Sequence, residues 1–234
     1  MAVQRHREKD EAPLVITDDM LVTEKPQAPQ EQRLYFEKNM SYFPIISIAL
    51  IVVNALVFSW ELSTDALAST ESIIDAGALY QANVLAGEYW RLVSAMFLHA
   101  DLEHLAANCI MLYILGLACE HAFSRGQMLG LYFMSGISGS ILSVSLLTGP
   151  SIGASGAVFG MMGATIAFFY KYKKQLVLRD NRIGFVLLIL AIYQIGTGFT
   201  TPYIDNFAHL GGLIGGSIVA LSFNSPLIKN ATGK

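Results

Sequence analysis

Six long apolar segments restrict what this chain can fold into. A helix that crosses a bilayer needs about 20 mostly apolar residues. Hydrophobic residues make up 53% of the 234 residues and charged residues 14%, and the mean hydropathy is +0.49. A soluble domain of this length needs more polar surface than that, so we predict an all-α polytopic membrane protein with six spans. The six candidate spans are Phe43–Trp60, Leu102–Cys119, Gln127–Thr148, Ile152–Tyr170, Ile183–Phe199 and Asn206–Phe223.

The polar segments around these spans define the expected domain organisation. Residues 1–40 are rich in charge and proline and lack an apolar run long enough for a signal peptide, which predicts a disordered cytoplasmic tail. Residues 41–224 form the six-span domain, and residues 225–234 form a short cytoplasmic tail. The outer loop, residues 61–101, is acidic, and its apolar residues Tyr89, Val93, Met96 and Phe97 recur at helical spacing. This spacing predicts an amphipathic helix that lies in the outer membrane interface.

The distribution of Lys and Arg predicts the orientation in the membrane, because positively charged loops stay in the cytoplasm. Of the 15 Lys and Arg residues, only Arg91 falls in a loop assigned to the outside. Both termini are then cytoplasmic. The chain has no basic stripe with interleaved aromatic residues, so we expect no nucleic-acid partner. The expected surroundings of the spans are the lipid bilayer.

Polar residues inside the predicted spans are the candidate functional residues, because polar groups in hydrocarbon cost free energy and usually serve a function. Counting from the cytoplasmic ends places Ser155, His104 and His209 about 22–24 Å above the cytoplasmic face, for untilted helices that rise about 1.5 Å per residue. Asn108 lies one turn from His104 on the same face, roughly 6 Å deeper. Three predicted helices thus bring a hydroxyl and two imidazoles to one level.

The surroundings of Ser155 suit a nucleophile. It lies in the motif Gly153-Ala154-Ser155-Gly156, where an irregular segment meets the start of a helix. Free backbone N–H groups at a helix start can stabilise an oxyanion beside the serine. We expect His104 and Asn108 to donate further hydrogen bonds to that oxyanion.

His209 is the candidate base for this serine. Small residues let membrane helices approach closely, so Gly156 on the fourth span and Gly212 and Gly216 on the sixth predict that these spans touch. His209 could then remove the serine proton. Asp205 lies one turn earlier, near the interface, and no acidic residue lies deep in a span, so we predict a Ser-His dyad without a third member.

Each of these signals also has a structural interpretation. A Gly-x-Ser-Gly sequence in a membrane helix often serves only helix contact, and a single buried histidine can simply bond a backbone carbonyl. His99, Glu103 and His104 suggest a zinc site, but residues five apart on a helix point about 140° away from each other, so we expect no metal. A transporter would hold its polar residues at the midplane, whereas these lie nearer the outer surface. The common depth of Ser155, His104 and His209, with Asn108 one turn deeper, favours catalysis.

These motifs resemble those of the rhomboid family of intramembrane serine proteases. The second span has the spacing His99-x4-His104-x3-Asn108, and the fourth has Gly153-x-Ser155-Gly156. The sixth has Ala208-His209-x2-Gly212-x3-Gly216, and the outer loop has the pair Trp90-Arg91. The resemblance implies a six-span rhomboid-like bundle of the bacterial form.

The resemblance also implies an activity. Ser155 and His209 would form the catalytic dyad, and His104, Asn108 and the backbone amide of Ser155 would form the oxyanion hole. Phe159 stands where some members have tyrosine and could stack on His209. The implied substrates are single-pass membrane proteins, cut near the outer end of their span at small residues, without a cofactor or metal.

The resemblance further implies that the protein lies in a bacterial inner membrane, with an active site that opens to the outer side. The alternative within this family is a non-catalytic protein that binds membrane clients. Such proteins are expected to lack the serine or the histidine, and this chain has both Ser155 and His209.

Overall fold

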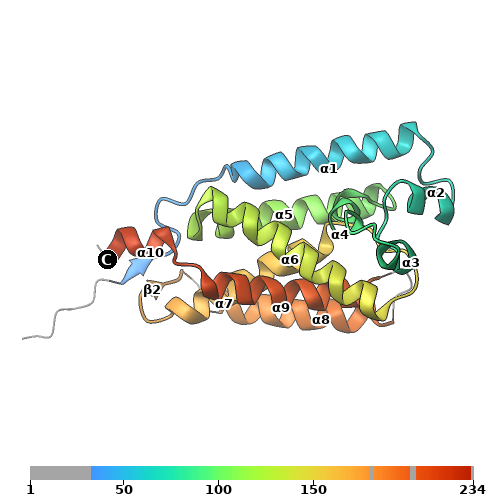
Figure 1. Ribbon diagram of the computed structural model, residues 1–234. Coiled ribbons are helices and arrows are strands. Elements are labelled where there is room, and N and C mark those ends of the chain that lie inside the picture. Colours follow the sequence, from blue (N-terminus) through green and yellow to red (C-terminus); the bar gives the residue numbers. More distant parts are fainter. Residues whose placement is uncertain (1–32, 180–181, 201–203, 233–234) are drawn as a thin grey trace, which may run out of the picture. The chain divides into compact units, whose positions relative to one another are not determined.

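Six long helices form the body of the part of the chain that the structure describes. The computed structural model describes residues 33–179, 182–200 and 204–232. The remaining residues, which include most of the predicted N-terminal tail, lie outside the described ranges. No end of a long helix lies more than three residues from the end predicted for its span. The six long helices, labelled in Figure 1, are α1 (Ile45–Ser63), α5 (Leu102–Ala122), α6 (Arg125–Leu146), α7 (Ser155–Tyr172), α8 (Ile183–Gly198) and α9 (Asn206–Ser222).

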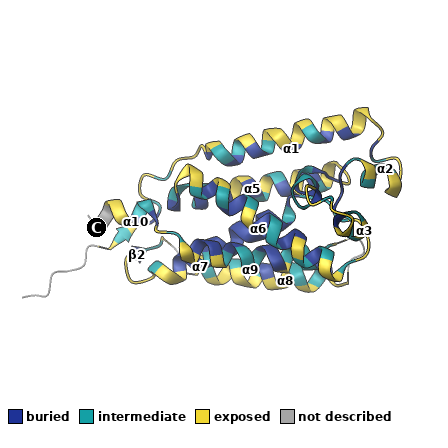
Figure 2. Ribbon diagram, in the orientation of Figure 1, coloured by how far each residue is buried: buried dark blue, intermediate teal, exposed yellow. Residues whose placement is uncertain are grey.

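The lengths and composition of these helices fit a multi-pass membrane protein. Three helices, α1, α5 and α6, are long and apolar enough to cross a membrane, as is the stretch Asn206–Asn230, which contains α9. A fifth apolar helix, α8, is shorter. Large apolar side chains on α1 and α8 are exposed, as expected for surfaces that face lipid (Figure 2). The predicted all-α membrane bundle is confirmed.

The centre of the bundle is α7, which contacts α5, α6, α8 and α9. Its residues from Gly156 through Thr165 are all buried (Figure 2). Glycines bring α9 against it: a Cβ atom on Gly212 would overlap the carbonyl oxygen of Gly156, and one on Gly216 would overlap that of Gly160. The predicted contact between the fourth and sixth spans is therefore confirmed.

Short elements lie at the end of the bundle where α7 finishes. Strand β1 (Leu34–Tyr35) pairs in parallel with β2 (Leu176–Val177), with Leu34 opposite Leu176. Phe36 follows β1 and is buried in the core. Helix α10 (Pro226–Thr232) lies at the same end (Figure 1) and is tied to α5, because the Ser225 hydroxyl donates to the carbonyl of Ala122.

The loop between α1 and α5 differs from its prediction. In place of one amphipathic helix it contains α2 (Thr70–Asp75), α3 (Gln81–Leu85), the four-residue α4 (Arg91–Ser94) and a 3-10 turn η2 (Ala95–Phe97). The buried guanidinium of Arg91 bonds the carboxylate of Glu88 and the carbonyl oxygens of Ile74 and Ala78, which folds the loop back on itself. A long straight helix could not make these contacts. That any of these helices lies in the membrane interface stays a prediction.

Candidate active site

Ser155 is the first residue of α7, and the backbone before it is held in place by the loop between α1 and α5. Gly153 has a left-handed φ of 126°, a conformation that side chains disfavour. Its N–H donates to the carbonyl of Ala95 over 2.8 Å, and Ser151 forms an antiparallel bridge with Leu79. The resulting turn leads into α7, and the first N–H groups of a helix have no partners inside it.

His209 contacts this hydroxyl directly. The distance between His209 Nε2 and Ser155 Oγ is 2.9 Å. The imidazole stacks on the ring of Phe159, with centroids 4.2 Å apart and planes at 10°. His209 Nδ1 is buried and has no hydrogen-bond partner in the described residues. The site thus holds a serine–histidine pair, and no acidic side chain of the described residues bonds the far side of the imidazole.

The position of His209 depends on the start of α9. Asp205 caps this helix, with its carboxylate accepting the N–H of Ala208 over 2.9 Å. The same carboxylate accepts the hydroxyl of Ser143 on α6. Asp205 therefore positions the start of α9, and its carboxylate bonds the N–H of Ala208 and the hydroxyl of Ser143.

His104 and Asn108 lie on α5 beside this pair. A Cβ atom on Gly153 would lie 2.8 Å from His104 Nε2 and 3.8 Å from Ser155 Oγ, so the imidazole reaches the turn before the serine. Asn108 is buried one turn further along, where its Nδ2 donates to the carbonyl of His104 over 3.0 Å. One N–H of the Asn108 amide is left for a further acceptor.

The remaining predicted residues lie around the site or in the loop. Gly156 and Gly212 form the contact that sets α9 against α7. The Arg91 guanidinium lies 4.6 Å from the centre of the Trp90 ring, and its hydrogen bond lowers the pKa of the Glu88 carboxyl. The hydrogen bonds of Arg91 are all to residues of the loop, so this residue shapes the loop.

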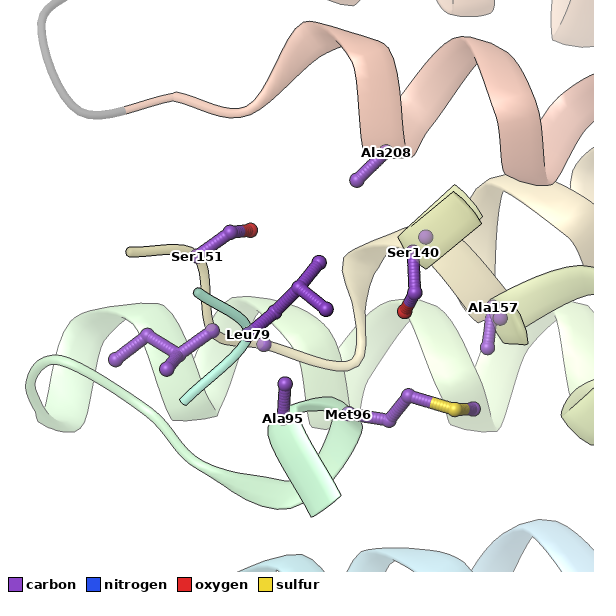
Figure 3. A pocket seen from close by; sticks show the side chains of 11 residues that line it. Leu79, Ala95, Met96, Ser140, Ser151, Ala157 and Ala208 are labelled. Atoms are coloured by element: carbon purple, nitrogen blue, oxygen red, sulfur yellow. The ribbon is translucent and has the colours of Figure 1, made fainter. Parts of the chain in front are cut away.

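A small cavity lies next to the start of α7. Its volume of about 20 Å³ is enough for one water molecule. Figure 3 shows the side chains of Met96, Ser140 and Ala208, from three separate segments, around this space. This cavity could not be predicted from the sequence, because its walls come from segments that are far apart in the chain. The lining residues are Leu79, Ala95, Met96, Gly136, Ser140, Ser151, Ile152, Gly153, Gly156, Ala157 and Ala208.

Two residues near the site have contacts that the sequence did not predict. His99 lies before the first residue of α5, Leu102, so the angle of about 140° expected between His99 and His104 on one helix does not apply. The two imidazole rings are in contact, with centroids 5.1 Å apart. Glu61, predicted in the outer loop, lies in α1 with its side chain buried and accepts the N–H of His99. Within the described ranges, no three His, Cys, Asp or Glu side chains are placed to hold a metal ion.

Several helices are long and apolar enough to cross a membrane, and the site holds a serine hydroxyl against an imidazole. The chain is therefore a polytopic membrane protein with a serine–histidine pair. The rhomboid domain matches residues 86–225, and the chain therefore belongs to the rhomboid family.

The similar proteins include bacterial and plant members. Rhomboid protease GluP of Bacillus subtilis (strain 168) is 32% identical over 206 residues, which cover 88% of this chain and 39% of GluP. The mitochondrial RHOMBOID-like protein 6 of Arabidopsis thaliana is 38% identical over 154 residues, 63% of this chain and 48% of that protein. Rhomboid protease AarA of Providencia stuartii is 28% identical over 229 residues, 83% of this chain and 79% of AarA. The chain thus spans less than half of the length of the first two.

Proposed function

We propose that this chain is an intramembrane serine endopeptidase that hydrolyses peptide bonds in or near the transmembrane segments of other membrane proteins. The observation that carries the proposal is the 2.9 Å contact between Ser155 Oγ and His209 Nε2 at the start of a buried helix. Membership of the rhomboid family, with the rhomboid proteases GluP and AarA among the similar proteins, supports it.

The proposed acylation step uses the two residues as nucleophile and base. His209 Nε2 takes the proton of the Ser155 hydroxyl as Oγ bonds to the carbonyl carbon of the substrate. His209 then gives this proton to the leaving amine, and the C–N bond breaks. Water, activated by the same imidazole, hydrolyses the acyl-enzyme and restores Ser155.

The oxyanion of the tetrahedral intermediate needs donors that are already in place. We assign this role to the backbone N–H of Ser155 and to the side chains of His104 and Asn108. The position of His104 against Gly153 and the remaining N–H of Asn108 support the assignment. No cofactor or metal is needed for this chemistry.

The substrate is proposed to be a single-pass membrane protein. We propose that this substrate carries a small residue next to the cut bond, because the cavity of about 20 Å³ beside Gly153 and Gly156 has little room for a side chain. We further propose that the chain lies in a bacterial inner membrane with both termini in the cytoplasm and the site open to the outer side. The segregation of Lys and Arg supports this orientation.

The proposal is tested by cleavage of a single-pass reporter substrate in liposomes. We expect wild type to cut it and Ser155→Ala and His209→Ala to lose roughly 10⁴-fold or more of the rate. Ser217→Ala is a matched control, because its hydroxyl bonds only the carbonyl of Leu213 on its own helix; it should cut like wild type.

Cleavage by Ser155→Ala would show that the mechanism is wrong. A folded wild-type protein that binds a panel of single-pass substrates and cuts none of them would favour the client-binding alternative.

A further inference from the structure

Glu61 has a buried carboxylate whose partner is a backbone group. Its side chain is fully buried near the outer end of α1, and both carboxylate oxygens accept the N–H of His99, over 3.2 and 3.3 Å. No Lys or Arg of the described ranges forms an ion pair with it. An ionisable group buried in a membrane protein without an opposite charge is expensive to keep, so a functional role should be sought for it.

The segment that Glu61 holds, residues 95–99, contacts the catalytic region at both of its ends. At one end the carbonyl of Ala95 accepts the N–H of Gly153, two residues before Ser155. At the other end the ring of His99 lies against the ring of His104, with centroids 5.1 Å apart and planes at 64°. Displacing this segment would therefore move the turn before the nucleophile and a proposed oxyanion donor together.

The ring of His99 is itself fixed. It is fully buried, and its Nδ1 lies 3.2 Å from the carbonyl oxygen of Phe97. Because a carbonyl only accepts, Nδ1 carries the proton in this contact. The imidazole thus forms a rigid wall beside His104, whose backbone is fixed separately by Asp101 at the helix start.

We propose that Glu61 and His99 are positioning residues for the oxyanion hole: the Glu61 carboxylate anchors residues 95–99, and the His99 ring holds His104 in its orientation. Neither residue touches the reacting atoms. This inference rests on the proposed protease function, because that function makes His104 an oxyanion donor and Gly153 part of the turn before the nucleophile.

Two pairs of substitutions separate positioning from general stability. Glu61→Gln keeps an oxygen that accepts the His99 N–H, whereas Glu61→Leu has similar size and no acceptor. His99→Phe keeps a ring against His104, whereas His99→Ala removes it. Asn54→Leu is the matched control, because Asn54 is a second fully buried polar residue on α1 and lies two turns from Glu61.

The measurements are kcat and KM for the reporter substrate in liposomes, with the thermal unfolding temperature of each variant. We expect Glu61→Leu to lower kcat by roughly 100-fold and His99→Ala by roughly 10-fold at nearly constant KM, since small displacements of catalytic groups have effects of this size. Glu61→Gln and His99→Phe should stay within about 3-fold of wild type. Asn54→Leu should change the unfolding temperature alone.

A wild-type kcat in Glu61→Leu would overturn the proposal, as would equal losses in Glu61→Gln and Glu61→Leu. A second readout does not need proteolysis: NMR of ¹⁵N-histidine-labelled protein, with the His104 signal assigned from His104→Ala. That signal should shift in Glu61→Leu and His99→Ala and stay in place in Glu61→Gln and His99→Phe. If wild type does not cut the substrate, the proposed function fails. The NMR signal of His104 then decides by itself whether Glu61 and His99 position the His104 side chain.

Discussion

At the scale of single residues, the ring of Phe159 stacks on the His209 imidazole and holds its plane in place. The two planes differ by 10° with centroids 4.2 Å apart, and Phe159 is buried at 3% exposure. Phe159→Leu keeps an apolar side chain but loses the flat surface, so the imidazole can rotate away from Ser155. We expect kcat to fall roughly 10-fold in liposome cleavage assays.

The control for this prediction is Phe159→Tyr, which keeps the aromatic face. It should cut within about 3-fold of wild type. A Leu variant as active as wild type would show that stacking on Phe159 does not orient His209.

His99 makes the stability of the protein depend on pH. Burial, with a smaller contribution from the nearby His104, lowers the pKa of His99 to about 4 from 6.5. Between these values the unfolded chain binds the proton and the folded one does not, so stability is complete above pH 6.5 and is lost as the pH falls toward about 4. The shift corresponds to at most roughly 3 kcal/mol.

The comparison that isolates this group is wild type against His99→Phe. We expect the free energy of unfolding of wild type in detergent micelles to fall more steeply between pH 6.5 and pH 4 than that of the variant. Parallel curves would contradict the assignment, because the other histidines are common to both proteins.

At the scale of the elements, the contact between α7 and α9 determines where the serine and the histidine meet. Gly212 lies one turn after His209, and a Cβ atom there would overlap the carbonyl oxygen of Gly156, next to Ser155. Gly212→Ala should therefore push the two helices apart, cost about 1–3 kcal/mol of unfolding free energy, and lower the cleavage rate.

Gly130→Ala on α6 is the control for this substitution. Its Cβ would meet only the Phe223 ring, at 3.9 Å. It should leave cleavage unchanged and stabilise α6 by up to about 1 kcal/mol, because alanine favours the helix. Equal effects of the two substitutions in unfolding and cleavage assays would show that close helix approach is not the cause.

The elements that could be predicted from the sequence are those determined by local pattern. Apolar length identified the long helices, and glycine spacing identified the contact of α7 with α9. Counting residues along three spans brought His104, Ser155 and His209 to one level, and the structure places their side chains together.

Contacts between distant segments could not be predicted in this way. Glu61 on α1 accepts the N–H of His99, and Arg91 bonds the carbonyl groups of Ile74 and Ala78, so both contacts join residues far apart in the sequence. A helical angle does not predict the contact of His99 with His104, because His99 precedes the first residue of α5.

At the scale of the whole domain, charge separates the two ends of the bundle. The described basic residues lie at the end where α7 finishes, with one exception, Arg91, in the loop at the other end. Ser155 starts α7 and so lies toward the end that carries this loop. The orientation in the membrane therefore decides on which side of the membrane the site opens.

Cysteine labelling tests that orientation in intact bacterial cells with a membrane-impermeant maleimide. Cys109 and Cys119 are free and are first replaced by alanine. Single cysteines are then introduced at two exposed positions, Ala68→Cys in the loop between α1 and α5 and Lys174→Cys after α7. Because positively charged segments stay in the cytoplasm, we expect Ala68→Cys to react in intact cells and Lys174→Cys to react only after lysis. The reverse pattern would place the site on the cytoplasmic side, where single-pass substrates would have to be cut near the inner end of their span.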